Sequence, residues 1–196
     1  MLTAIKEIIN PAVVLDIATA DKTLTLKEDG VDSKIRKLHI QNVPEKAFAF
    51  TLDHQPHGRD NRLFKQLSCY VDISNKEGIN KGCDLVLLIP RESRFIVLAF
   101  DLKSKKPNKR DTEKQLLNSE IYVRYLMAIA QCHYGVDIDC VEYKRAIVTT
   151  GERKGMNKRA TYRPNEKRSD KASFHIESVR VNRKQEANVY LNALLK

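Results

Sequence analysis

The chain has 196 residues, of which 42% are hydrophobic and 31% charged, and 35 Lys and Arg against 25 Asp and Glu give a net charge of +10. This length suits one globular domain with its own hydrophobic core, and the apolar share excludes a wholly disordered chain. The apolar runs are too short to cross a bilayer, and Glu7 and Asp16 interrupt the region where a signal peptide would lie. We therefore expect a soluble, cytoplasmic protein that does not contact a membrane.

Hydrophobic spacing predicts the elements of the N-terminal half. A helix is expected over residues 2–9, where apolar residues recur at helical spacing ahead of Pro11. The span from about 12 to 46 is ambiguous, and residues 1–45 are a candidate N-terminal appendage. The other expected elements of this half are short strands at 23–26 and 38–43, a strand over 47–52, a polar loop over 53–60, a helix over 61–73 and a loop over 74–82.

Two nearly continuous aliphatic runs, at 83–89 and 94–103, dominate the middle of the chain. Runs of this kind are typical of central strands that are covered on both faces. A helix should begin at Asp111 or Thr112 and run to about His133. Strands over 141–149 and 174–181 and an amphipathic helix over 184–195 complete the chain. This order predicts an α/β fold with a mixed central β-sheet flanked by helices.

The positive charge is concentrated in two segments, residues 103–114 with six bases and two acids, and residues 153–171 with eight bases and two acids. Two basic segments on an otherwise neutral domain indicate a polyanionic partner, and nucleic acid is favoured over a membrane because 153–171 has no apolar face. Alternatively, 153–171 is a solvated basic loop that serves solubility. The candidate nucleic-acid-binding residues are Lys105, Lys106, Lys109, Arg110, Arg153, Lys154, Lys158, Arg159 and Arg163.

Acidic and basic side chains mark the ends of the two central strands. Asp84 opens the first strand, and Asp101 and Lys103 share one face at the end of the second, while Leu102 turns back into the core. If the strands pair as a hairpin-like unit, Asp84 and Asp101 meet and offer carboxylate oxygens to a hard cation such as Mg²⁺. Lys103 can then orient an attacking water, and Gln115 in the next helix can reach the same water or a phosphate oxygen.

These residues, written G-C-D-(x16)-D-L-K and then K-Q-L-L-N-S-E, resemble the PD-(D/E)xK nuclease superfamily. The resemblance implies a restriction-endonuclease-like core over about 60–150, inside a single nuclease domain over 1–196. It implies that Asp84, Asp101 and the main-chain carbonyl of Leu102 bind Mg²⁺, for which Mn²⁺ would substitute. Lys103 would be the catalytic lysine, and Gln115 matches the helix glutamine of several branches.

The chain departs from the family pattern at two points. Cys83 stands where the family has the proline that gives it its name. Some branches also take a glutamate from the helix upstream, and here Asp60 and Asp72 are the acids that could replace it.

The other reactive side chains predict no second site. The four cysteines form no C-x-x-C pair and are interpreted as reduced structural thiols. His54 and His57 lie three residues apart in the polar loop and are interpreted as polar surface, although such a pair could ligate a metal or act as a general base.

The sequence thus predicts a Mg²⁺-dependent nuclease that hydrolyses phosphodiester bonds, with DNA expected in preference to RNA and endonucleolytic cutting expected. A ribonuclease is one alternative, and a non-catalytic nucleic-acid-binding module on the same fold is another. The protein could act as a homodimer or within a larger complex.

Overall fold

The computed structural model describes residues 1–30, 32–54, 64, 67–72, 74–92, 94–104, 108–150 and 174–196. Within these ranges the chain is mixed α/β and has two mixed sheets, a large sheet of six strands and a small sheet of four. The helices are α1 (Leu2–Ile8), α2 (Lys109–Tyr134) and α3 (Leu191–Leu194), with a 3-10 turn, η1 (Pro11–Val13). No helix of the described ranges is long and apolar enough to cross a membrane.

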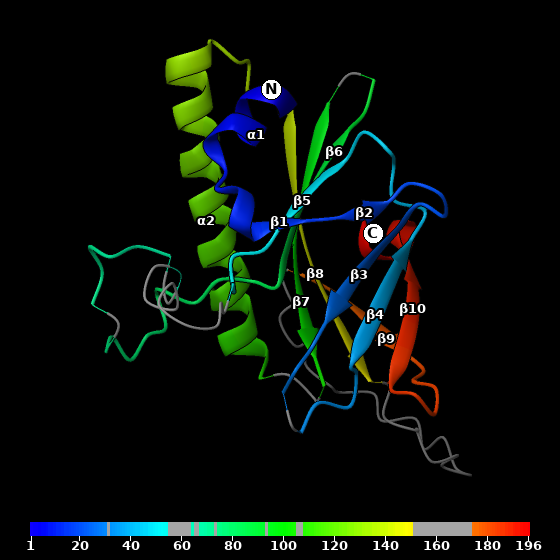
Figure 1. Ribbon diagram of the computed structural model, residues 1–196. Coiled ribbons are helices and arrows are strands. Elements are labelled where there is room, and N and C mark those ends of the chain that lie inside the picture. Colours follow the sequence, from blue (N-terminus) through cyan, green and yellow to red (C-terminus); the bar gives the residue numbers. More distant parts are fainter. Residues whose placement is uncertain are drawn as a thin grey trace, which may run out of the picture.

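The large sheet has the strand order β1-β5-β6-β7-β8-β9. Its strands are β1 (Val14–Leu15), β5 (Phe48–Phe50), β6 (Leu85–Pro90), β7 (Phe95–Lys103), β8 (Val141–Thr150) and β9 (His175–Val179). The pairs from β1 to β7 are antiparallel, whereas β7, β8 and β9 run parallel. Because α2 connects the parallel strands β7 and β8, it forms a crossover that lies along one face of the sheet (Figure 1).

The small sheet covers the other face of the large sheet (Figure 1). Its order is β10-β4-β3-β2, with β10 parallel to β4 and the other pairs antiparallel. Its strands are β2 (Ile17–Ala18), β3 (Thr23–Lys27), β4 (Lys37–Gln41) and β10 (Glu186–Tyr190). The first 45 residues therefore contribute strands to both sheets.

Alternation along the central strands explains how one sheet supports two cores. In β7, Ile96, Leu98 and Phe100 pack toward the small sheet, whereas Val97 and Ala99 pack toward α2. Successive side chains of a strand point to opposite faces, so a strand covered on both sides must be apolar at nearly every position. The predicted strands and the predicted helix over 2–9 are confirmed, with ends shifted by a few residues.

The predicted helix over 184–195 is wrong, because this segment forms β10 and then the short helix α3. Ala187 and Val189 are buried, whereas the residues on either side of each are more exposed. This alternation has the two-residue period of a strand. The leucines that follow have the spacing of a helix, which is why a helix was expected. Pairing with β4 makes residues 186–190 a strand instead. As a result, α1 and α2 lie on one face of the large sheet, whereas the short helix α3 packs with the small sheet on the other face.

Two further boundaries differ from expectation. Helix α2 begins at Lys109 because Asn108 caps it, its side chain accepting the Arg110 N–H at 3.2 Å. In the predicted helix over 61–73, residues 67–72 form turns. There Asn80 accepts the Ser68 N–H at 3.1 Å and donates to the Val71 carbonyl at 2.8 Å, which replaces helical hydrogen bonding. Residues 61–63, 65–66 and 73 lie outside the described residues, as does the predicted basic loop over 153–171.

Gly82 allows the chain to pass close to β5 just before Asp84. A Cβ atom at this position would lie 2.3 Å from the carbonyl oxygen of Leu52, and Leu52 cannot easily move because its N–H donates to the Cys83 carbonyl at 3.1 Å. Gly82→Ala is therefore expected to lower the free energy of unfolding by about 3 kcal/mol.

Denaturant unfolding measures this effect, and Gly30→Ala is the matched control. The added Cβ at Gly30 would meet the flexible end of the Glu28 side chain, so a change below about 1 kcal/mol is expected there. Equal effects of the two substitutions would contradict the assignment of Gly82 as a close-approach position.

Candidate active site

The antiparallel pairing of β6 and β7 brings Asp84 to Asp101. Leu85 is paired with Phe100, so the residue before the first strand and the residue after Phe100 lie opposite each other. The Leu102 N–H donates to Asp84 Oδ2 at 2.6 Å, and the two carboxyl groups lie close enough to influence each other's pKa. The expectation that these two acids converge from a hairpin-like unit is confirmed.

Asp101 and Lys103 lie on the α2 face of β7, whereas Leu102 packs into the core between the two sheets. Asp101 is 1% exposed, and its Oδ2 atom forms an ion pair with the Lys103 ammonium. Within the described part of the chain this buried oxygen accepts no hydrogen bond of standard geometry. A buried carboxylate oxygen that pairs with an ammonium group could pair with a metal cation in its place.

Gln115 joins the site from the second turn of α2. Its Oε1 atom accepts from Lys103 Nζ at 3.0 Å, and its Nε2 atom donates to the Gly82 carbonyl at 2.7 Å. The same Nε2 atom lies 3.4 Å from Asp101 Oδ1. One amide thus holds the lysine and fixes the backbone that leads to Asp84, a role that sequence reasoning did not foresee.

Both acids are held in an environment that disfavours their charge. Burial raises the pKa of Asp84 well above its usual range, and the neighbouring Asp101 carboxylate raises it further. Burial also raises the pKa of Asp101, while the Lys103 ammonium opposes that shift. A cation bound beside the two carboxylates would relieve both effects by offsetting their negative charge.

The raised pKa of Asp84 predicts that the free energy of unfolding depends on pH. Since the folded protein raises the pKa of Asp84, the folded state keeps a proton that the unfolded state loses above about pH 3.8. Stability from this group is therefore present at low pH and lost as the pH rises through the folded-state pKa. In Asp84→Asn the amide oxygen can still accept the Leu102 N–H and the amide nitrogen can donate to Asp101, with no charge to bury.

In chelator, the Tm of Asp84→Asn is expected to exceed that of the wild type by an amount that grows with pH above 3.8. Each 1 kcal/mol corresponds to about 2–4 °C in a chain of this size. Thermal melts across pH measure the difference between the two proteins. A difference that stays constant with pH would contradict the predicted titration.

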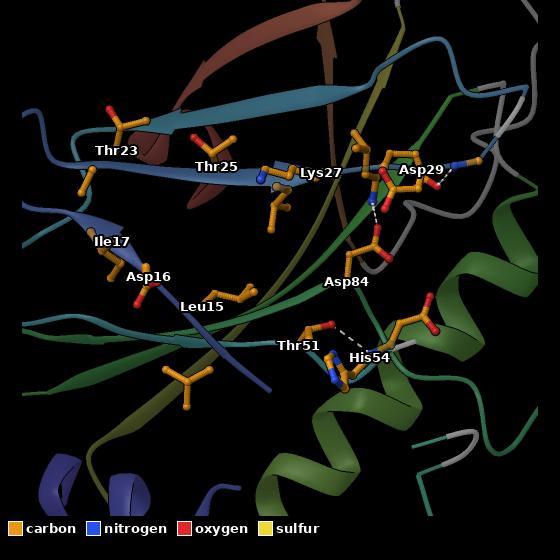
Figure 2. Close-up of a pocket in the computed structure, with 17 residues that line it drawn as sticks. Leu15, Asp16, Ile17, Thr23, Thr25, Lys27, Asp29, Thr51, His54 and Asp84 are labelled. Carbon is orange, nitrogen blue, oxygen red and sulfur yellow. Dashed lines mark hydrogen bonds between the residues drawn. The ribbon is translucent and has the colours of Figure 1, made fainter. Parts of the chain in front are cut away.

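A groove of about 880 Å³ opens beside Asp84, between the small sheet and the end of β5. Figure 2 shows Asp84 lying between the Lys27 and Asp29 end of β3 and the segment from Thr51 to His54. Sequence analysis did not place Asp53 and His54 here, because nothing local indicates that β5 is the neighbour of β6 in the sheet. The charge of Asp53 contributes to the raised pKa of Asp101, which shows that it belongs to the same electrostatic environment.

Cys83, which directly precedes Asp84, is buried and donates its thiol to the Leu85 carbonyl at 3.2 Å. Burial raises the pKa of this thiol to about 12. Since the thiolate is the reactive form, Cys83 should resist a thiol reagent at neutral pH until the protein unfolds. Exposed Cys69 is the internal reference and should react quickly. Peptide mapping after alkylation checks this, and rapid labelling of Cys83 in the folded protein would contradict it.

The remaining predicted residues fall into three groups. Lys109 and Arg110 are exposed in the first turn of α2. Asp72 is exposed, and its carboxylate accepts from the N–H and hydroxyl of Ser74 at 2.9 and 2.8 Å, so it closes a turn instead of joining the buried acids. Asp60, Lys105, Lys106, Arg153, Lys154, Lys158, Arg159 and Arg163 lie outside the described residues.

Asp84 and Asp101 are the side chains of this site that could hold a metal ion. The described residues contain no group of three or more His, Cys, Asp or Glu side chains placed to hold a metal ion. Mg²⁺ commonly uses one or two carboxylates and completes its shell with water and substrate phosphate, so a pair of carboxylates could hold it.

No family model, curated protein or solved structure matches the chain.

Proposed function

We propose that this chain is a Mg²⁺-dependent nuclease that hydrolyses phosphodiester bonds, with DNA as substrate and endonucleolytic cutting. The observation that carries the proposal is the buried Asp101 carboxylate, which contacts Asp84, Lys103 and Gln115 where two adjacent strands meet. Carboxylates, an ammonium group and an amide in this arrangement are the groups needed to hydrolyse a phosphate diester with a metal ion.

In this proposal Asp84, Asp101 and the main-chain carbonyl of Leu102 would hold the metal, with Mn²⁺ as a substitute. Bound Mg²⁺ supplies positive charge to the scissile phosphate and lowers the pKa of a water molecule. Lys103 orients the attacking water in line with the bond that breaks, and its charge offsets the charge that develops on the phosphoryl oxygens. Gln115 keeps the Lys103 ammonium fixed through the 3.0 Å hydrogen bond.

The topology around the site supports the same proposal. Strands β6 and β7, the crossover helix α2 and the parallel strand β8 follow one another in the order that the resemblance to PD-(D/E)xK nucleases implies. We propose that these elements form a restriction-endonuclease-like core. The small sheet is then an addition to that core, built from the N-terminal strands and β10.

The nucleic acid would approach along the N-terminal end of α2. Lys109 and Arg110 are exposed there, about one and a half turns before Gln115. Together with the basic residues predicted at 105–106 and 153–163, they would contact backbone phosphates. Contacts of this kind give salt-dependent affinity without sequence information.

A cleavage panel with the purified wild-type chain tests this function. Labelled single-stranded, duplex and branched DNA and RNA are each incubated with Mg²⁺, Mn²⁺ or EDTA. The proposal expects cutting of DNA with either metal and none in EDTA. Preferential cutting of RNA would change the substrate to that of a ribonuclease. Binding that EDTA leaves unchanged, without cutting of any substrate, would replace the nuclease by a nucleic-acid-binding module.

A further inference from the structure

A second, smaller pocket adjoins the groove beside Asp84. It has a volume of about 250 Å³ and lies between α1, the end of β5 and α2. Thr51 and His54 line both the groove and this pocket, so the two cavities are neighbours. Figure 2 shows the segment that carries these two residues beside Asp84.

The pocket lies close to the two acids of the candidate active site. Leu52, in its wall, donates its N–H to the Cys83 carbonyl at 3.1 Å, and Cys83 directly precedes Asp84. Adjacent strands are about 4.8 Å apart, so this wall lies one strand spacing from the backbone that carries Asp84. On the other side of the pocket, Tyr122 lies two turns of α2, about 11 Å, beyond Gln115. A nucleotide near a phosphate bound at the acids can therefore reach the pocket.

The lining combines aromatic rings with hydrogen-bonding groups. The His54 and Phe64 rings meet edge to face, with centroids 5.0 Å apart and an interplanar angle of 84°, and α2 adds the half-buried ring of Tyr122. Asn10 adds an amide that is held in place, because its oxygen accepts the Ala12 N–H at 2.9 Å. Ligand sites typically have this composition, but those for drug-sized molecules measure about 300–1,000 Å³. The smaller volume here fits a single flat ring system.

We propose that this pocket receives an unpaired base of the DNA whose phosphate binds at Asp84 and Asp101, a proposal that rests on the proposed nuclease function. The base is the part of a nucleic acid that is flat, aromatic and edged with hydrogen-bonding groups, so it matches the lining. Stacking on aromatic side chains stabilises bound bases of every sequence. A paired base must first leave its partner and its stack, which costs free energy. The pocket therefore favours single-stranded, mismatched or branched DNA over a fully paired duplex.

Abasic scanning of a bound oligonucleotide tests the pocket separately from cleavage. A single-stranded DNA oligonucleotide, and abasic versions that each lack one base at successive positions, are titrated with the full chain in EDTA. Removing the base that enters the pocket should weaken binding by the wild type about tenfold, because the stacking on the aromatic rings is lost. Removing a base elsewhere should change the affinity much less.

Phe64→Ala assigns the effect to the pocket through a double-mutant cycle. This variant should bind the intact strand about as weakly as the wild type binds the abasic strand, and removing the base should then weaken binding little further. Phe95→Ala is the matched control, because Phe95 is also a half-buried phenylalanine but begins β7, at the opposite end of that strand from Asp101. It should keep the full abasic effect. His54→Ala should reproduce Phe64→Ala, and circular dichroism confirms that each variant is folded.

Two results would overturn the base pocket. One is equal affinity of the wild type for the intact strand and for every abasic strand, and the other is a full abasic effect in both Phe64→Ala and His54→Ala. If the chain still cut DNA with Mg²⁺, the proposed nuclease would stand without this pocket. An abasic effect that depends on Phe64, without cutting of any DNA, would instead support the pocket and contradict the nuclease.

Discussion

Asp101→Asn is expected to reduce metal-dependent DNA cleavage by at least about 10³-fold. The asparagine has nearly the shape of the aspartate and can still accept the weak hydrogen bond from Gln115 at Oδ1. What it removes is the negative charge that would bind the metal and that holds the Lys103 ammonium. The fold should survive, because a neutral side chain avoids the cost of a buried carboxylate and Lys103, at 30% exposure, can be solvated.

Single-turnover cleavage and a DNA-binding titration together measure this effect. Binding should be unchanged or slightly tighter in Asp101→Asn, because one negative charge near the phosphates is lost. Glu45→Gln, which neutralises an exposed acid in the segment between β4 and β5, is the matched control and should cleave normally. Normal cleavage by Asp101→Asn would show that Asp101 is a structural acid.

Lys103→Met is expected to reduce cleavage by about 10²–10³-fold while leaving metal binding intact. Methionine keeps much of the length and apolar volume of the lysine stem but has no charge and cannot donate to Gln115. Since the lysine ammonium competes with a metal ion for the Asp101 carboxylate, metal affinity should be retained or increased. This separation of cleavage from metal binding distinguishes a catalytic lysine from one that only stabilises the fold.

Titration with Mn²⁺, followed by electron paramagnetic resonance, measures metal affinity beside the cleavage rate. Lys103→Arg is an informative companion variant. The guanidinium keeps the positive charge, but it is planar and wider than the ammonium group that the site holds in the wild type. It should bind metal and cleave poorly. Cleavage by Lys103→Met at the wild-type rate would contradict the water-orienting role of Lys103, but it would not contradict the metal site.

The convergence of the acids was predictable because it depends on local patterns. Two aliphatic runs joined by a short turn predict an antiparallel pair, and the two-residue period of a strand places Asp101 and Lys103 on one face. The helix that follows could be predicted from its apolar spacing. These features need no knowledge of which distant segments pair.

The features that sequence analysis missed all depend on long-range pairing. The segment 184–195 is a strand because β4 provides an edge to pair with, and Asp53 reaches the site because β5 is the neighbour of β6. Neither neighbour can be inferred from the segment itself. The turns at 67–72 depend in the same way on Asn80, whose side chain takes the hydrogen bonds that a helix would have made.

The measurement that tests the central claim most directly is single-turnover cleavage of DNA by the wild type, Asp84→Asn and Glu45→Gln, each with Mg²⁺ and with EDTA. If Asp84 and Asp101 form a metal-dependent nuclease site, the wild type and Glu45→Gln cleave only with Mg²⁺, and Asp84→Asn, although folded and more stable in chelator, does not cleave. Cleavage by Asp84→Asn at the wild-type rate, or cleavage by the wild type in EDTA, would contradict the account.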